Sequence, residues 1–428
     1  MLRDCLPSSV RRTLDELPES LDETYERILK EIKKPNRAHA RRVLQCLVVA
    51  TRPLRVAELA GVLAVDFDDG EGIPRLKADW RWEEEELALL SACSSLIAIV
   101  EADGSRVVQF SHFSVKEFLT SPRLAIASGE VSNYYIDLEP AHTILGQACL
   151  GVLLQIQDDA EGCTPEDHPV AGYGAEHWMT HARFGEVSSR LHNGMKYLFD
   201  VDKPHFKVWL KLWDIDTGPN RGTAFYQFTP HYKSRATPLY YAALCGFHHL
   251  VEHLITEHSQ DVNADGGYYM RPLVAALAGE HFQTADLLRH NGADPHIRGY
   301  SRRTPLQSAA YYGSLEVVRR LIEYGADINA KDKDKMAPLH WTSYGRYFKD
   351  GSVLRLLLEH GADINMQDGD GWTPLYFASR NGALEVVRLL LEYGADVEAK
   401  GKGGMTALQV AVGKHDKVSK LLREYGAK

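Results

Sequence analysis

The stretch TPLYFASRNGALEVVRLLLEYGAD, residues 373–396, decides how the second half of this chain folds. Thr373 is an N-cap residue type and Pro374 needs no amide donor at the first helical position, so a short apolar helix should begin here. Gly382 should end that helix in the left-handed conformation that glycine adopts without steric cost, and a second helix should follow over 384–393. The stretch therefore predicts a pair of short helices.

The same two phrases recur along the chain with a fixed period. A Pro-Leu or equivalent pair returns after 34, 33, 33, 36 and 33 residues, and Gly-Ala-Asp keeps the same register. The first phrase begins at Thr237, Arg271, Thr304, Ala337, Thr373 and Thr406, and the second at Gly292, Gly325, Gly361 and Gly394. One such unit cannot bury its apolar face alone, so stacked neighbours must supply the core. Leu357 and Leu390 fall at the same place in two second helices and are predicted to be buried.

This pattern resembles the ankyrin repeat over about 195 residues, as six units. Only His340 occupies the position after Thr-Pro-Leu that is usually histidine. The other units have Tyr240, Val274, Gln307, Tyr376 and Gln409 there and are expected to lose one hydrogen-bond relay between repeats. Glu280 stands where the glycine between the two helices is expected. The fourth unit is three residues longer, which predicts an irregular turn over 343–352.

The first half of the chain has a different order of elements. Amphipathic or apolar patterns predict helices over 12–34, 37–50, 56–65 and 83–96, followed by strands over 97–100 and 106–111 and a further helix. The turn between the two strands is 101–105. Three or four helices followed by a β-hairpin form a winged-helix arrangement.

Three segments of this half resemble the region that follows the NACHT nucleotide-binding module in fungal NACHT-ankyrin receptor-like (NLR-like) proteins. They are LPESLDETYERIL at 17–29, TRPLRVAELAGVLAV at 51–65 and VVQFSHFSVKEFLTS at 107–121. A similar module is known as the winged-helix domain of GPI inositol-deacylase. The resemblance implies a relay between a nucleotide switch and an ankyrin sensor, with a NACHT module as a partner in a longer chain.

The nucleotide module itself is missing from the sequence. No GxxxxGK[ST] loop occurs, and the Gly-Lys pairs at 401–402 and 413–414 have no Ser or Thr after them. No GxSxG elbow occurs either, so no deacylase chemistry is implied. The chain starts close to where a NACHT module would end. A truncated receptor, a misplaced gene start and a product that lost its switch all remain open.

The chain as a whole is predicted to be mainly α, with a helical, winged-helix region followed by an ankyrin-repeat α-solenoid. The predicted parts are 1–35, a helical tail resembling the end of a NACHT module; 36–125, the winged-helix domain; 126–230, a helical connector; and 231–428, the ankyrin repeats. The connector is too apolar for a flexible linker, and its Trp178, Trp209 and Trp213 are expected to pack.

Charge and composition exclude several classes of partner. The net charge is −9, with 25 basic and 35 acidic residues in 1–230 against 24 and 23 in 231–428. Neither half has the positive excess that nucleic acid or an anionic membrane would attract, and the wing at 101–105 carries two acids. The longest uncharged windows, 87–100 and 141–157, are shorter than a membrane span, and no secretory signal is present. The sequence predicts a cytoplasmic protein with reduced cysteines.

Candidate chemistry is sparse. The pairs His177/His181 and His249/His253 have helical spacing but lack third and fourth metal ligands, so ordinary structural histidines are favoured and no metal or cofactor is predicted. His112 has no identifiable nucleophile beside it. An enzyme with its active site in 126–230 is the weaker hypothesis, and no catalytic residue is assigned.

The hairpin tips of the repeats are the predicted binding residues, because they carry aromatic, Met and charged side chains of the kinds enriched at interfaces. The predicted protein-binding residues are Tyr268, Met270, Tyr300, Arg303, Tyr311, Tyr312, Lys333, Met336, Asp370, Trp372, Lys402 and Met405. The alternative is that these rings only pad adjacent hairpins. The leading function is non-catalytic protein recognition as the sensor part of an NLR-like protein; a free adaptor or scaffold is the alternative, and a DNA-binding winged helix is a weaker one.

Overall fold

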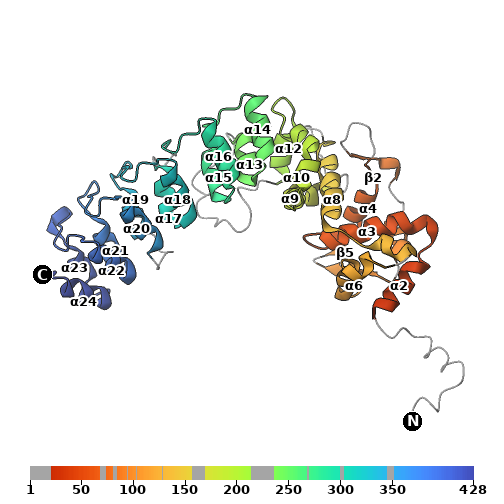
Figure 1. Ribbon diagram of the computed structural model, residues 1–428, viewed down its shortest axis with the longest axis horizontal. Helices are drawn as coiled ribbons and strands as arrows, with labels where there is room; N and C mark the ends of the chain where they lie inside the picture. The colour runs from red at the N-terminus through yellow and green to blue at the C-terminus, as the bar shows by residue number, and fades with distance from the viewer. Residues whose placement is uncertain are drawn as a thin grey trace, which may run out of the picture. The chain divides into compact units, whose positions relative to one another are not determined.

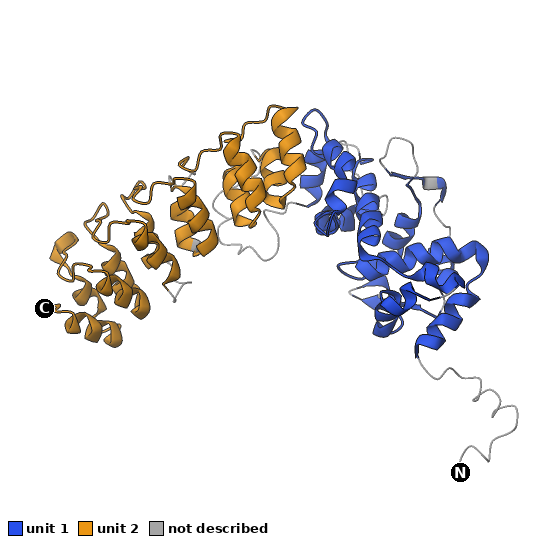
Figure 2. Ribbon diagram, viewed as in Figure 1, with its two compact units in different colours: residues 1–221 blue, residues 222–428 orange. Residues whose placement is uncertain are grey.

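The structure of the protein is a computed structural model. It describes residues 21–67, 74–80, 84–93, 95–102, 104–127, 129–156, 169–213, 236–267, 269–298, 303–344 and 351–428. The chain divides into two compact units, residues 1–221 and 222–428 (Figure 2). Within the described part of the chain, none of the helices combines the length and the apolar character needed to cross a bilayer.

The first unit opens with the predicted helices, each somewhat shorter than its sequence pattern (Figure 1). They are α2 (Leu21–Glu31), α3 (Arg37–Val49), α4 (Val56–Leu63), α5 (Glu85–Cys93) and α6 (Phe113–Leu119), with α7 (Pro122–Ala125) and the 3-10 turns η2 (Lys34–Asn36), η3 (Ala78–Trp80) and η4 (Gly129–Tyr134). The part of the predicted first helix before Leu21 lies outside the described residues. The helix-rich order predicted from the sequence is confirmed.

A small antiparallel sheet completes the winged-helix arrangement. The predicted hairpin is β4 (Ile97–Ala102) and β5 (Ser105–Phe110), and a short strand that the sequence did not reveal, β1 (Leu54–Arg55), pairs with the other edge of β5. Val108 is the central register position, opposite both Leu54 and Ile99. A second two-stranded ribbon joins β2 (Val65–Asp66) to β3 (Arg75–Leu76).

The described part of the connector region contains helices that pack within the first unit. Its helices are α8 (Leu138–Leu153), α9 (Pro169–Ala182), α10 (Val187–Arg190), α11 (His192–Leu198) and α12 (His205–Leu212). Helix α8 packs against both α3 and α9. Trp178 and Trp209 are fully buried, with ring centroids 5.7 Å apart, and the Trp209 Nε1–H donates to the Ala175 carbonyl at 2.9 Å. These two tryptophans give the connector a core of its own.

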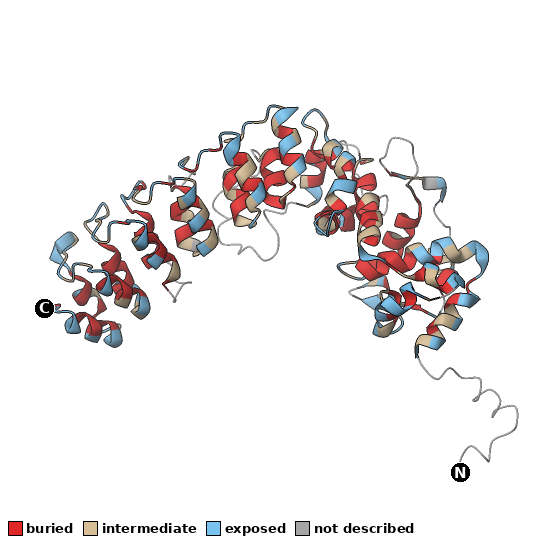
Figure 3. Ribbon diagram, in the orientation of Figure 1, coloured by how far each residue is buried: buried red, intermediate tan, exposed pale blue. Residues whose placement is uncertain are grey.

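The second unit is a row of six helix pairs between residues 236 and 428 (Figure 1). The pairs are α13 (Pro238–Cys245) with α14 (His248–Thr256), α15 (Pro272–Ala278) with α16 (Phe282–His290), α17 (Pro305–Tyr312) with α18 (Leu315–Glu323), α19 (Pro338–Tyr344) with α20 (Ser352–Glu359), α21 (Pro374–Asn381) with α22 (Leu384–Glu392), and α23 (Ala407–Ala411) with α24 (Asp416–Glu424); the turn η8 (Lys402–Gly404) precedes α23. Leu357 and Leu390 are 0% exposed, which confirms their predicted core positions. Figure 3 shows the buried residues concentrated in these helices, with exposed residues on the loops and on the outer sides of some helices.

The predicted caps are present. The Thr373 side chain accepts from the Tyr376 N–H at 3.4 Å, and Thr304 forms a reciprocal capping box with Gln307. Gly382 and Gly313 end their helices in the left-handed region, with φ of 69° and 71°. The third and fifth repeats are therefore delimited by local chemistry that their own sequence specifies.

One expectation about the relay between repeats is wrong. His340 makes the relay as predicted: its Nδ1 accepts from the Ala337 N–H at 3.0 Å, and its Nε2 lies 3.1 Å from the Trp372 carbonyl. Gln307 was expected to lose this relay, yet its amide nitrogen donates to the Ala330 and Met336 carbonyls at 2.7 and 2.9 Å. A glutamine amide has two N–H donors, so it reaches two carbonyls of the next hairpin where histidine reaches one.

Glu280, the residue in the place of the expected glycine, has a φ of 59°. A left-handed backbone costs about 1 to 2 kcal/mol for a residue with a Cβ. We expect Glu280→Gly to raise the free energy of unfolding by roughly 0.5 to 1 kcal/mol, part of the relief being lost to the greater freedom of glycine in the unfolded chain. Urea unfolding of the two proteins measures this difference.

The matched control for that substitution is Gly394→Ala. Gly394 has a φ of 88°, and a Cβ there would meet no atom within 4 Å, so only the backbone conformation is tested. This control should lower stability by about 1 kcal/mol. Loss of stability in Glu280→Gly would show that the Glu280 side chain, and not its backbone, decides the turn.

The predicted irregular turn of the fourth repeat includes residues 345–350, which lie outside the described residues.

Candidate functional site

An aromatic ladder crosses three successive units of the repeat row. Tyr311 of α17 meets Trp341 of α19 edge to face, with ring centroids 5.7 Å apart. Trp341 meets Tyr344 at 5.8 Å, and Tyr344 meets Phe377 of α21 at 5.9 Å. Edge-to-face pairs at such distances are favourable beyond the area they bury. We call these four residues the aromatic ladder.

The ladder is part core and part surface. Trp341 and Phe377 are each 6% exposed, whereas Tyr311 is half-buried and Tyr344 is 43% exposed. Arg303 covers the ladder at one end, with its guanidinium carbon 3.5 Å from the Trp341 ring centroid. This is a cation–π geometry, which keeps the charge of Arg303 at the surface beside the rings. The exposed rim of the ladder is therefore aromatic and positively charged.

The neighbouring hairpin tip is fixed to the ladder by hydrogen bonds. The Trp341 Nε1–H donates to Asp332 Oδ2 at 3.0 Å, and Asp332 Oδ1 accepts from the backbone N–H of Asp334 and of Met336 at 2.9 Å. Asp332 is itself 7% exposed. Because one buried carboxylate holds both the tip and the indole ring, Lys333 and Lys335 project from a rigid turn.

Adjacent hairpins are also bonded to one another. The Gly369 N–H donates to the Asp334 carbonyl at 2.8 Å, and the Lys402 N–H donates to the Asp370 carbonyl at 2.8 Å. Lys402 and Asp370 form an exposed ion pair at 3.0 Å as well. The three hairpin tips, residues 332–336, 368–372 and 401–405, thus form a continuous row beside the aromatic ladder. We call this row the hairpin rail.

The twelve predicted binding residues fall into distinct groups. The exposed ones are Lys333, Asp370, Lys402 and Met405, and the half-buried ones are Met270, Arg303, Tyr311 and Trp372. Tyr268 and Tyr300 lie outside the described residues, as does the side chain of Tyr312. The structure brings Arg303 and Tyr311 together at the ladder, and Asp370 and Lys402 together on the rail.

Met336 is a correction to the predicted set. It is 7% exposed, and its backbone serves the hairpin: the carbonyl accepts from Gln307 and the N–H donates to Asp332. A buried side chain in this position supports the turn and offers no contact area to a partner. We therefore remove Met336 from the proposed surface.

Trp372 does pad the next hairpin, as the alternative interpretation held. Its ring stacks on Tyr376 with centroids 3.9 Å apart and planes at 17°. A Cβ on Gly401 would lie 1.9 Å from Trp372 Cε3, so glycine is required for the backbone to pass over the ring. Trp372 is half-buried, and its truncation would disturb packing as well as the surface.

Sequence reasoning missed Trp341, Tyr344 and Phe377. The signal was present as an offset within each repeat: Trp341 and Phe377 each lie four residues after the start of the Pro-Leu phrase, at Ala337 and Thr373 (341 − 337 = 4; 377 − 373 = 4). Tyr344 lies seven residues after Ala337, as Tyr311 does after Thr304 (344 − 337 = 7; 311 − 304 = 7). Positions four and seven of a helix share one face, so aligned units would have shown the ladder.

Two histidines of the first unit, His181 and His112, have structural partners. His181 is fully buried, with Nδ1 2.8 Å from His142 Nδ1 and Nε2 2.9 Å from the Tyr173 hydroxyl. Burial, with smaller effects of His142 and His177, lowers the pKa of His181 to about 3. The His112 ring accepts from the Ser114 N–H at 3.3 Å as the N-cap of α6. Both residues thus have the ordinary roles that the sequence favoured.

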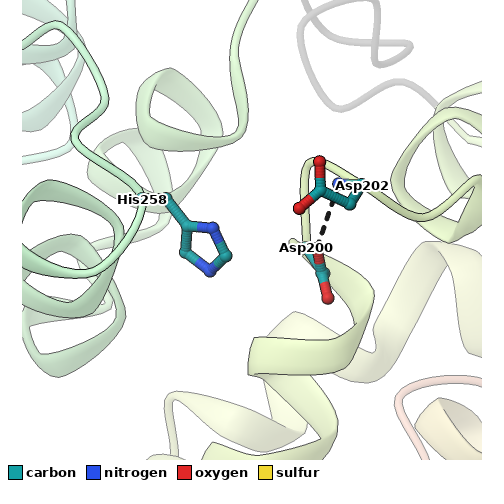
Figure 4. Close-up of side chains that lie close together, drawn as sticks. All are labelled: Asp200, Asp202 and His258. Atoms are coloured by element: carbon teal, nitrogen blue, oxygen red, sulfur yellow. Dashed lines mark hydrogen bonds between the residues drawn. The ribbon is translucent and has the colours of Figure 1, made fainter.

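No metal centre can be built within either unit from the described residues. Asp200 and Asp202 lie on one turn after α11, where the Asp202 N–H donates to Asp200 Oδ1 at 3.0 Å (Figure 4). Two carboxylates alone supply too few ligands to hold a metal ion. His258, drawn in the same figure, belongs to the second unit and is not counted with them.

Comparison with known families matches both parts of the chain. Residues 273–368 and 339–428 match the family described as ankyrin repeats (3 copies), and residues 234–266 match the ankyrin repeat. Residues 25–129 match the winged-helix domain of GPI inositol-deacylase. The confirmed resemblances are those to the ankyrin repeat and to this winged-helix module.

Curated relatives match over parts of the chain. Azaphilone pigments biosynthesis cluster protein L of Monascus ruber is 31% identical over 298 residues, which is 66% of this chain and 61% of that protein. Ankyrin repeat and SOCS box protein 5 of Mus musculus is 38% identical over 103 residues, 24% of this chain and 31% of that protein. Human inversin is 31% identical over 113 residues, 26% of this chain and 11% of that protein. The chain thus spans less than two thirds of each of these relatives and combines a winged-helix domain of the GPI inositol-deacylase type with ankyrin repeats.

Proposed function

We propose that this protein recognises another protein, without catalysis, over the aromatic ladder and the adjoining hairpin rail. The observation that carries the proposal is the exposure of Tyr344, 43%, beside the buried Trp341 and the stacked Arg303. Tyr, Trp and Arg are the residue types enriched at interface anchors, and this group is held rigidly before any partner arrives.

The chemistry of the surface suggests the kind of segment that it binds. The rings offer apolar contact, and Arg303, Lys333 and Lys335 flank them with positive charge. A short extended or helical segment, apolar with acidic flanks, complements this arrangement. Ankyrin-repeat relatives support a binding role.

The place of this binding activity in a larger protein is a further part of the proposal. The winged-helix domain would relay the state of the ankyrin sensor to a NACHT module, as in NLR-like signalling proteins of the cytoplasm. The alternative is an adaptor or scaffold that works without such a switch. Sequencing the transcript upstream of residue 1 tests this point: an in-frame phosphate-binding loop supports the relay, and an in-frame stop codon supports the adaptor.

DNA binding by the winged helix is disfavoured by charge. Glu101, at the tip of the β4–β5 wing, is exposed, and Arg106 of the same wing is paired with Glu86 of α5 at 2.5 Å. An acidic wing with a neutralised arginine would repel phosphate groups.

The proposed surface is tested by Tyr344→Ala, with Tyr393→Ala as the matched control. Tyr393 is 40% exposed at the end of α22 and lies away from the ladder along the chain, so it controls for loss of an exposed ring. In a pull-down from an extract of the source organism, compared by quantitative mass spectrometry, Tyr344→Ala should lose a specific protein that the wild type and Tyr393→Ala retain. Retention of every partner by a folded Tyr344→Ala protein would contradict the proposed surface.

A further inference from the structure

A basic cavity lies in the first unit. It has a volume of about 540 Å³ and is bounded by strand β3, the end of α8 and the start of α12. The polar groups that line it are Arg75, Lys77, Gln155, Lys203 and His205, with the ring of Tyr197. Among the described residues on its wall, none is acidic. Its volume is in the range of small-molecule sites.

Two turns bring these groups together from distant parts of the sequence. The backbone of Arg75 lies opposite that of Asp66 in the antiparallel β2–β3 ribbon. The Lys77 N–H donates to the Ala64 carbonyl at 2.9 Å. Pro74 passes so close to α8 that a Cβ on Gly151 would lie 2.2 Å from the Pro74 carbonyl oxygen. Glycine at 151 therefore allows the basic ribbon to close one side of the cavity.

The other side is formed by the turn that leads into α12. The hydrogen bond between the Asp202 N–H and Asp200 Oδ1 shapes this turn (Figure 4), so that Lys203 precedes the helix and His205 begins it. Lys203 lies with its Nζ 3.9 Å from the centre of the Tyr197 ring. Lys203, His205 and Tyr197 all line the cavity.

The two lysines keep donor capacity for a ligand. Lys77 lies 3.7 Å from Asp66 and Lys203 lies 3.7 Å from Asp200, distances longer than an N–H···O hydrogen bond. Each ammonium has three N–H donors, so a carboxylate at that distance does not use them up. Both ion pairs therefore hold the ammonium groups in place without satisfying them.

His205 also lines the cavity. Its Nδ1 is buried and has no hydrogen-bond partner among the described residues. Burial, and next the charge of Lys203, lower the pKa of His205. The residue also begins α12, which has no side-chain cap, so backbone N–H groups and the positive end of the helix dipole are added to the same region.

We propose that this cavity binds the phosphate group of a small phosphate monoester. A phosphate dianion offers several acceptor oxygens in a tetrahedral arrangement, and it can meet a guanidinium, two ammonium groups and an imidazole from different sides. The volume leaves room for an organic group beyond the phosphate itself. The inference does not depend on the proposed protein-binding surface, which lies in the other unit.

The test is isothermal titration calorimetry of the full chain with inorganic phosphate and with glycerol 3-phosphate. Lys203→Gln and Arg75→Gln remove charge from the two sides of the cavity, and Lys207→Gln removes an exposed charge from α12 that does not line it. We expect each cavity variant to raise the Kd by roughly tenfold or more, the scale of one lost charge-assisted hydrogen bond, and Lys207→Gln to leave it unchanged.

The two ligands separate the sources of the phosphate group. Tighter binding of glycerol 3-phosphate supports a monoester site, whereas binding of inorganic phosphate alone would overturn the monoester assignment. Arg75 is exposed, so its variant tests the site even if Lys203→Gln fails to fold. No heat of binding from either ligand, or equal weakening by Lys207→Gln, would overturn the proposal.

Discussion

Leu390→Ala is expected to lower the free energy of unfolding by about 2 to 5 kcal/mol, because it opens a cavity at a fully buried position of α22. The loss should begin at the carboxy-terminal end of the repeat row, since each unit is supported mainly by its neighbours. Urea unfolding followed by circular dichroism measures the change, and hydrogen exchange locates it.

The control for this large effect is Thr373→Ala in the preceding helix of the same unit. Thr373 contributes an N-cap hydrogen bond to the Tyr376 N–H, so its loss should cost about 1 kcal/mol. Equal costs for the two substitutions would contradict the assignment of core and cap within the repeat.

Arg52→Ala should destabilise the first unit by about 3 kcal/mol, because it leaves a buried carboxylate without its partner. Glu58 is 3% exposed and receives two hydrogen bonds from the Arg52 guanidinium, at 2.8 and 2.7 Å. After the substitution, the hydrogen bond from the Arg55 N–H to Glu58 Oε2, at 2.8 Å, would remain. Unfolding monitored by the fluorescence of the buried tryptophans measures the loss.

An exposed ion pair in the same unit provides the comparison. Arg123 lies 2.8 Å from Asp22, with 54% and 39% of the two side chains exposed. Solvent screens such a pair, so Arg123→Ala should cost less than about 1 kcal/mol. Equal losses of stability in Arg52→Ala and Arg123→Ala would contradict the view that the burial of Glu58 makes the Arg52 pair important.

The fold was largely predictable because its signals are local and repeated. Thr373, Pro374 and Gly382 act within a few residues of their own backbone, and the repetition of such groups along the row gives the period. The breaks within the helical connector were less visible: α9 ends at Ala182, and Gly185, with a φ of 49°, lies in the turn before α10. Strand β1 is only two residues long and exists through its pairing with β5.

The candidate site was predictable only in part, because contacts between neighbouring ankyrin repeats decide which side chains are exposed. The sequence placed Arg303 and Tyr311 at the surface but gave no reason to join them to Trp341. Met336 was predicted to project from a tip, and its burial follows from the hydrogen bonds that Gln307 and Asp332 make around it. Side-chain packing across repeats therefore separates candidate binding residues from supporting ones.

The most direct test of the protein-binding surface is the dissociation constant of the most enriched partner in the pull-down, measured by calorimetry for the wild type, Tyr344→Ala and Tyr393→Ala. Loss of an interface anchor costs about 2 kcal/mol or more, so Tyr344→Ala should raise the Kd by roughly thirtyfold, with Tyr393→Ala unchanged. A folded Tyr344→Ala protein that binds this partner with wild-type affinity would contradict recognition through the aromatic ladder.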